Sequence, residues 1–241
     1  MTSISRSGRA STTSPRCATV LRELEALGTA QNRKIYGRHG AKAPMFGVSY
    51  AHFTRIQKRI KTDHELAREL WASGNHDARV LATMIADPRA ATLPQLNAWK
   101  KDLDDPVLTD AFSGFVAKTS HARARMEQWT RSKHEWVGHA GWLLLARLAR
   151  TEMSPPDAQL TEYLRTIERD IQGSKNRVRD AMNSALIAIG TRGAALEKKA
   201  IAAARKIGKV LVDYGETDCK TPDAEAYILK TRQRARAASD G

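Results

Sequence analysis

Apolar residues recur along most of the chain at intervals of three and four positions. Phe53, Ile56 and Ile60 form one such series, and residues 80–85 contain another. This spacing places apolar side chains on one face of a helix. No segment alternates apolar and polar residues over the length of a strand, and aromatic residues make up only 6% of the chain. The pattern therefore predicts an all-α protein.

Proline dipeptides divide the chain into segments of helical length. They are Asp87-Pro88, Asp105-Pro106, Pro155-Pro156 and Thr221-Pro222. A residue before proline disfavours the helical conformation, whereas proline itself suits the first turn of a new helix. These breaks predict about ten helices, with one helix pair for roughly every 40 residues, which is the period of HEAT-like repeats. We expect an α-α superhelix, a HEAT-like repeat solenoid. Because the segments show little sequence similarity to one another, a compact non-repetitive helical bundle is the alternative.

The first residues are rich in Ser, Thr, Arg and Gly and contain no apolar stretch. We expect a disordered basic leader over residues 1–18, followed by a single HEAT-like domain over residues 19–241. No apolar run reaches the ~18 residues of a membrane span, so no membrane contact is expected. Cys17 and Cys219 are too few for a disulfide framework or a cysteine metal site, which suits the cytoplasm. No metal and no cofactor are expected.

Positive charge is unevenly distributed along the chain. The formal net charge is +14. Residues 1–62 contain 12 Lys and Arg against 2 Asp and Glu, whereas residues 63–112 contain 5 against 9. A basic excess of this size suits a polyanionic partner, because phosphates neutralised by Lys or Arg release counterions.

Three segments concentrate basic residues that could contact a DNA backbone. Residues 31–44 combine four cations with Gly37 and Gly40, which would let the main chain approach a phosphate. A second pair lies at i,i+4 on the next predicted helix, and a third lies near the start of a later helix. The predicted contacts are Arg33, Lys34, Arg38, Lys42, Arg55, Arg59, Arg177 and Arg179. Such segments are also typical of solvated loops and helix faces, which is the alternative interpretation.

Several segments resemble the AlkD-like DNA alkylation repair family of HEAT-like repeat proteins. They include Phe46-Gly-Val-Ser, His64-Glu-Leu-Ala and His76-Asp-Ala-Arg in the first half of the chain. Residues 212–225 (VDYGETDCKTPDAE) resemble the C-terminal signature of a divergent branch. The resemblance extends from about residue 36 to about residue 230. It implies a superhelix wrapped around double-stranded DNA, and excision of alkylated purines as the family's founding activity.

The resemblance also implies candidate site residues. Asp110 falls where the catalytic carboxylate would lie, and one carboxylate can stabilise an oxocarbenium-like sugar. The same acid could equally interact with a helix dipole. Pro106 replaces an expected aromatic residue, and Ser184 and Ile187 align with a Trp and an Arg of the family's catalytic groove. His139 stands where a phosphate-contacting Arg is found.

Tryptophans elsewhere could restore an aromatic cleft. The candidates are Trp99, Trp136 and Trp142, although tryptophan on a helix commonly belongs to the core. Three functions remain open at this point: an alkylpurine DNA glycosylase, a non-catalytic binder of DNA structures, and a protein-interaction scaffold. We expect DNA binding by a monomer associated with the nucleoid in the cytoplasm, with double-stranded DNA as the partner.

Overall fold

The structure, a computed structural model, describes residues 13–239, and all regular secondary structure in this range is helical. The helices are α1 (Pro15–Leu27), α2 (Ala30–Arg38), α3 (Tyr50–Ile60), α4 (His64–Ala72), α5 (His76–Ile85), α6 (Leu93–Trp99), η1 (Lys100–Asp102), α7 (Pro106–Val116), α8 (Ala122–Trp129), α9 (Glu135–Leu148), α10 (Asp157–Asp170), α11 (Asn176–Gly190), α12 (Ala194–Ile207) and α13 (Ala224–Ser239). The predicted all-α, HEAT-like class is confirmed. The expected count of about ten helices is too low, because the described range contains thirteen α-helices.

Side-chain caps explain why the proline positions alone predict too few helices. The cap residues accept a hydrogen bond from the backbone N–H three positions later; they are Ser14, Thr29, Ser49, Asp63, Asn75, Thr92 and Asp105. Such a cap satisfies one N–H that the helix itself leaves without a partner. Helices α4 and α5, for example, are separated only by the short Ser73–Asn75 segment. A proline is therefore not needed to divide them.

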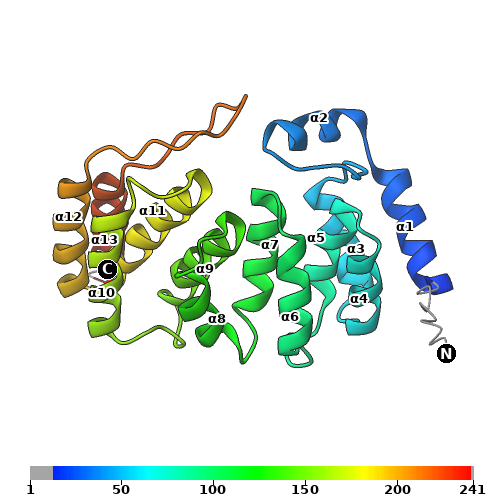
Figure 1. The fold of residues 1–241 in the computed structure, drawn as a ribbon, viewed down its shortest axis with the longest axis horizontal. Helices are drawn as coiled ribbons and strands as arrows, with labels where there is room; N and C mark the ends of the chain where they lie inside the picture. The colour runs from blue at the N-terminus through cyan, green and yellow to red at the C-terminus, as the bar shows by residue number, and fades with distance from the viewer. Residues whose placement is uncertain (1–12, 240–241) are drawn as a thin grey trace, which may run out of the picture.

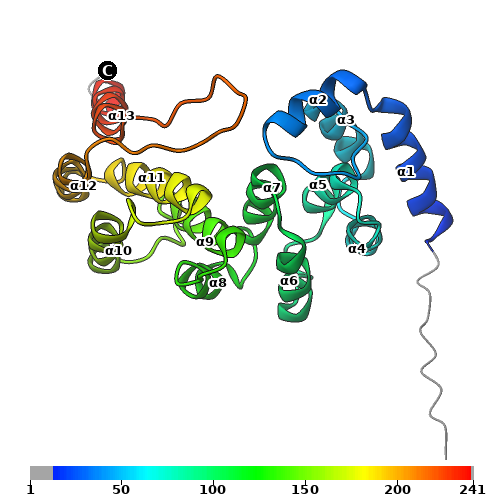
Figure 2. The ribbon, with the colours of Figure 1, turned by 45° about the horizontal axis from the view of Figure 1, so that its top comes forward.

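From α4 onward the α-helices form two curved rows (Figures 1 and 2). Helices α4, α6, α8, α10 and α12 make the outer row, and α5, α7, α9, α11 and α13 make the inner row. Within the inner row, α5 packs on α7, α7 on α9, and α9 on α11. The 208–223 segment rises at one end of the inner row and α2 rises at the other. We call the side of the inner row between them the hollow side.

Close packing between the rows depends on small residues at particular positions. A Cβ atom placed on Gly141 would lie 2.4 Å from the backbone nitrogen of Thr130, so α9 can approach the end of α8 only with glycine there. Gly190 of α11 is similar, since a Cβ would lie 2.8 Å from the Cβ of Ala200 on α12. The short residues that interrupt the apolar pattern thus allow successive helices to stack.

The N-terminal boundary differs from the expected one. Helix α1 begins at Pro15 and is capped by Ser14, so residues 15–18 of the predicted leader are helical. Cys17 and Val20 from this helix are buried in the core. Residues 1–12 of the predicted leader lie outside the described residues. Across residues 13–239, no helix combines the length and apolar character that crossing a membrane requires.

Candidate nucleic-acid interface

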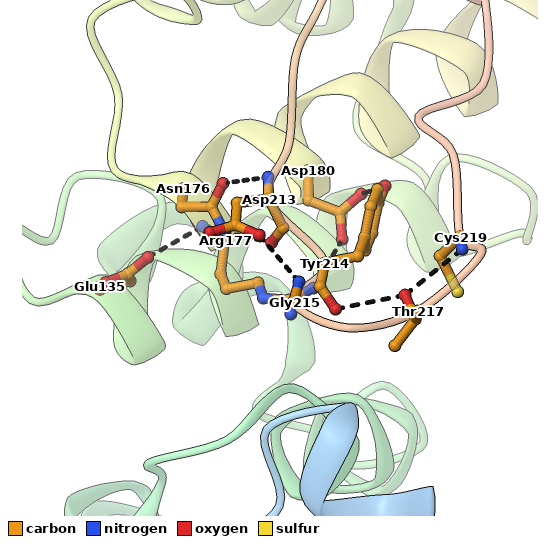
Figure 3. A network of polar contacts seen from close by, with 9 residues as sticks. All are labelled: Glu135, Asn176, Arg177, Asp180, Asp213, Tyr214, Gly215, Thr217 and Cys219. Atoms are coloured by element: carbon orange, nitrogen blue, oxygen red, sulfur yellow. Dashed lines mark hydrogen bonds and ion pairs between the residues drawn. The ribbon is translucent and has the colours of Figure 1, made fainter.

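Residues 208–223 form an extended segment between α12 and α13, which we call the strap. Figure 3 shows how its middle is fixed to the first turns of α11. The Asn176 amide makes two hydrogen bonds with the backbone of Asp213: its Nδ2 donates to the carbonyl oxygen at 2.7 Å, and its Oδ1 accepts from the backbone N–H at 2.8 Å. The Tyr214 hydroxyl donates to Asp180 Oδ1 at 2.8 Å. Asp213 and Tyr214 in the middle of the strap are therefore both hydrogen-bonded to α11.

Arg177 and Arg179, which the sequence predicts as DNA contacts, make their contacts within the structure mainly with the strap. The Arg177 guanidinium lies 5.3 Å from the centre of the Tyr214 ring, and its side chain is only 13% exposed. Arg179 donates to the Leu211 carbonyl at 2.8 Å. Burial raises the pKa of Asp180, against the opposing effects of the Tyr214 hydroxyl and the Arg177 charge. Basic residues at a helix start can serve a neighbouring loop as well as a phosphate, and local sequence does not distinguish these uses.

The strap reaches from α11 across the hollow side to the end of α2. Gly215 has a φ of +68°, and a Cβ placed on it would lie 3.1 Å from the carbonyl oxygen of Arg38. The neighbouring Gly40 approaches Pro106 at the start of α7, where a Cβ would lie 3.4 Å from the proline ring. The two ends of the superhelix therefore meet through the strap and the end of α2.

Asp110 lies on the hollow side in direct contact with Arg147. Arg147 Nη2 donates to Asp110 Oδ1 at 2.7 Å, joining α7 to α9. The Asp110 side chain is 59% exposed, so it faces solvent next to the arginine. The sequence alone does not associate Arg147 with Asp110, because the two residues are 37 positions apart and meet only through helix packing.

A cavity of about 500 Å³ lies beside this ion pair. It is lined by residues of α9 and the turn after it, α11, the strap and α13; they include Arg147, Arg150, Ser184, Ile187, Pro222 and Tyr227. Ser184 and Ile187, the positions singled out by the family resemblance, thus lie in the same cavity as Arg147. Arg150 is exposed and forms no ion pair within the described residues. The cavity therefore presents two cations to the hollow side.

The predicted cations of α2 and the following loop divide into two groups. Lys34 and Arg38 are exposed and form no ion pair within residues 13–239. Arg33 donates to the Phe46 carbonyl at 3.0 Å, and Lys42 lies 3.5 Å from Asp104. Lys34 and Arg38 remain candidates for phosphate contacts, while the other two cations also make contacts within the protein.

The two predicted cations on α3 also have neighbours within the protein. Arg59 forms an ion pair with Glu23 of α1, and Arg55 contacts the His52 ring. Both side chains are exposed. An exposed ion pair contributes little to stability, so these contacts leave both residues available to a partner.

The three tryptophans predicted to line an aromatic cleft pack in or against the core. Trp99 is 5% exposed and stacks on Trp71 with ring centroids 4.2 Å apart, and Trp142 is 2% exposed. Trp136 is half-buried and packs against the core. These tryptophans belong to the core, because helical spacing alone does not reveal which face of a helix a ring occupies. The aromatic side chains near the site that reach solvent are Tyr50 and Tyr227, each of which is about half exposed and half covered by the protein.

Tyr50 lies close enough to Asp110 for their electrostatic interaction to matter. Its pKa is raised to about 12, first by burial and then by the negative charge of Asp110. The Tyr50 hydroxyl therefore stays protonated near neutral pH and can donate a hydrogen bond. It adds an uncharged donor to the surroundings of the Asp110–Arg147 pair.

His139 cannot contact a phosphate, contrary to the family resemblance. It is 3% exposed, inside α9. Burial, helped by the positive charge of Arg177, lowers its pKa to about 3. The residue is thus neutral and enclosed. Arg147, at the end of α9, and Arg150, just beyond it, are the cations that line the hollow-side cavity.

We expect the buried His139 to make the fold sensitive to mild acid. In the unfolded chain a histidine binds a proton below about pH 6.5, whereas the folded His139 resists protonation down to about pH 3. The contribution of the neutral, buried His139 to the free energy of unfolding is therefore fully present above pH 6.5 and is lost as the pH falls. Between pH 6.5 and pH 5 the loss from this group is ~2 kcal/mol. Urea unfolding at both pH values measures it.

A matched pair of variants isolates this effect. His139→Gln should remove the pH dependence that His139 causes, whereas His134→Gln, at an exposed position, should keep it. An identical pH dependence in His139→Gln and the parent protein would contradict the assignment.

Comparison with known proteins places these features in context. A family model described as "DNA alkylation repair enzyme" matches residues 20–226. The uncharacterized protein Lin0241 of Listeria innocua is 31% identical over 218 residues, covering 88% of this chain and 95% of that protein. Lmo0209 of Listeria monocytogenes, also described as uncharacterized, is 30% identical, covering 89% and 96%.

One solved structure is similar over nearly the whole chain. It superposes with a TM-score of 0.81 at 31% sequence identity, covering 91% of this chain and 94% of the other. It is described as "a new family of proteins related to the HEAT-like repeat DNA glycosylases with affinity for branched DNA structures".

Proposed function

This chain belongs to the DNA alkylation repair enzyme family, and from that premise we propose that it binds branched DNA on its hollow side. The observation that carries the proposal is the strap, which runs from α11 to the end of α2 across the surface that carries Arg147 and Arg150. A straight duplex lying along the inner row would have to pass the strap. At a branch point the arms diverge, so separate arms can lie on either side of it. The similar structure described as having affinity for branched DNA supports this choice.

Cations on both sides of the strap would bind the arms through their phosphates. Arg147 and Arg150 lie at the α9 side, and Lys34 and Arg38 lie at the α2 side. Contacts to phosphates position a protein without reading sequence. Because Asp110 holds the Arg147 guanidinium, this contact is oriented before DNA binds. We propose a monomer that acts with the nucleoid in the cytoplasm and recognises DNA shape.

The expected result is selective binding to a junction. Fluorescence anisotropy would compare a labelled four-way junction with a linear duplex of the same total length, across a series of salt concentrations. We expect the junction to bind roughly tenfold more tightly, ~1.4 kcal/mol. The logarithm of the association constant should fall linearly with the logarithm of the salt concentration. Equal affinity for the two DNAs at every salt concentration would contradict the proposal.

A second candidate function is excision of alkylated purines. Asp110 favours it, because this carboxylate is exposed on the hollow side and lies 2.7 Å from Arg147. A purine alkylated on a ring nitrogen is already a good leaving group, so stabilising the positively charged sugar is the main requirement. The test compares abasic-site formation on methylated duplex DNA by the parent protein and Asp110→Asn. Excision that depends on Asp110 supports this activity, and absence of abasic product leaves DNA binding alone.

A further inference from the structure

A second cavity, of about 760 Å³, lies beneath the base of the strap. Its lining comes from α11, α12, the two ends of the strap and the start of α13. A volume of this size is typical of small-molecule sites. Pro222 is the one lining residue that this cavity shares with the cavity beside Arg147.

The two extended halves of the strap border the cavity without pairing with each other. In the described chain, no hydrogen bond joins residues 208–212 to residues 219–223. The backbone N–H groups of Lys209, Val210 and Leu211 donate to no group of residues 13–239. Because residues 209–211 also line the cavity, its border includes backbone N–H groups that are available to a ligand.

Asn183 contributes a buried acceptor to the same cavity. Its side chain is 1% exposed, and its Nδ2 donates to the Pro222 carbonyl at 2.9 Å. This bond fixes the orientation of the amide, because the opposite orientation would place two acceptors together. Asn183 Oδ1 has no hydrogen-bond partner. A buried acceptor without a partner costs about 1–3 kcal/mol, which a donor on a ligand would recover.

The remaining lining combines apolar walls with cations. The apolar side chains are Leu186, Ala204, Ile207, Val210, Val212 and Pro222. Lys209 and Lys220 are exposed, line the cavity and form no ion pair within the described residues. Arg205 is instead paired with Glu225 at 2.6 Å. A ligand that fits has a flat apolar body, an N–H donor at one edge and a negative charge at the other end.

We propose that this cavity binds an adenine nucleotide. The apolar side chains contact the faces of the ring, and the exocyclic amine donates to Asn183 Oδ1. Ring nitrogens accept from the unpaired backbone N–H groups of the strap, and the phosphate lies between Lys209 and Lys220. A free nucleotide and an unpaired adenosine in a DNA strand share this chemistry. The assignment holds whether or not DNA binds on the hollow side.

The first experiment titrates the full chain with AMP, adenosine and CMP in a calorimeter and compares the three affinities. We expect saturable binding of AMP, with at least a tenfold weaker affinity for CMP, which lacks the purine ring. Replacing Lys209 and Lys220 together by Gln should weaken AMP binding about tenfold and leave adenosine binding unchanged. Both lysines are exposed, so this variant should fold. Absence of saturable AMP binding, or an unchanged affinity in the double variant, would overturn the proposal.

A second pair of variants tests the location. Ala204→Phe places a large ring in the cavity, whereas Ala202→Phe places the same ring on an exposed position of the same helix. We expect only the first to abolish AMP binding, with both retaining the helical circular dichroism spectrum. Loss of binding in Ala202→Phe alone would reject this cavity.

Competition identifies the source of the nucleotide. An oligonucleotide duplex with one unpaired 3′ adenosine displaces AMP if the site takes a nucleotide of a DNA strand. A fully paired duplex should not displace it. If neither DNA competes while AMP binds, the site takes the free nucleotide. Displacement of AMP by the fully paired duplex would overturn the proposal, because an adenine that is stacked and paired within a duplex cannot enter the cavity.

Discussion

Replacing Asp77 by alanine is expected to lower the free energy of unfolding by ~3 kcal/mol or more. Asp77 is completely buried in the first turn of α5. Its carboxylate accepts hydrogen bonds from the backbone N–H groups of Phe46, Gly47 and Val48, at 2.7, 3.1 and 2.7 Å. Alanine would leave these buried donors without a partner. The same change would release the segment that joins α2 to α3.

Thermal and urea unfolding measure this effect directly. For a chain of this size, a loss of ~3 kcal/mol lowers Tm by about 6 °C or more. Asp218→Ala, at an exposed position of the strap, is the matched control and should change stability little. Asp77→Asn should also destabilise, because its amide nitrogen cannot accept from the backbone donors. A loss below about 1 kcal/mol in Asp77→Ala would show that the three bonds do not hold this segment.

Reversing the two cations of the hollow-side cavity is expected to reduce affinity for a four-way junction about 100-fold, ~2.7 kcal/mol. Arg147→Glu with Arg150→Glu removes two proposed phosphate contacts and places repulsive charges in the same positions. It also leaves Asp110 without its partner. Competition binding at a fixed salt concentration measures the change.

The control reverses the same number of charges on the outer row. Arg165 and Arg169 of α10 have side chains that are 70% and 72% exposed, and each has an acidic neighbour. Arg165→Glu with Arg169→Glu should weaken junction binding only a few-fold, through the long-range change in net charge. Equal losses in the two double variants would mean that net charge, and not the hollow side, determines binding.

The helical class could be predicted because its causes are local. Apolar spacing in α3 and a first-turn proline in α7 mark helices without knowledge of their neighbours. The number of helices is harder to predict from the sequence, since a cap such as Asn75 begins a helix without a proline. Cap residues three positions before their partners are the signal that would have improved the count.

The candidate site could be predicted only in part, because its residues meet through tertiary packing. Asp110 was found through the family resemblance, whereas Arg147 becomes visible only once α7 lies against α9. His139 shares α9 with Arg147, yet it points into the core, and nearly every face of that helix carries apolar residues. Arg177 has the sequence context of a phosphate ligand but faces Tyr214. In each case the deciding neighbour is distant in sequence.

The most direct test of the central claim places a photo-activated cross-linker on either side of the superhelix. In a Cys219→Ser background, where Cys17 is buried, Ser184→Cys puts the probe in the hollow-side cavity and Ala158→Cys puts it on α10 of the outer row. Each labelled protein is irradiated with a four-way junction, and the cross-linked DNA is quantified. We predict efficient cross-linking from position 184 and little from position 158. Cross-linking from position 158 and not from position 184 would contradict DNA binding on the hollow side.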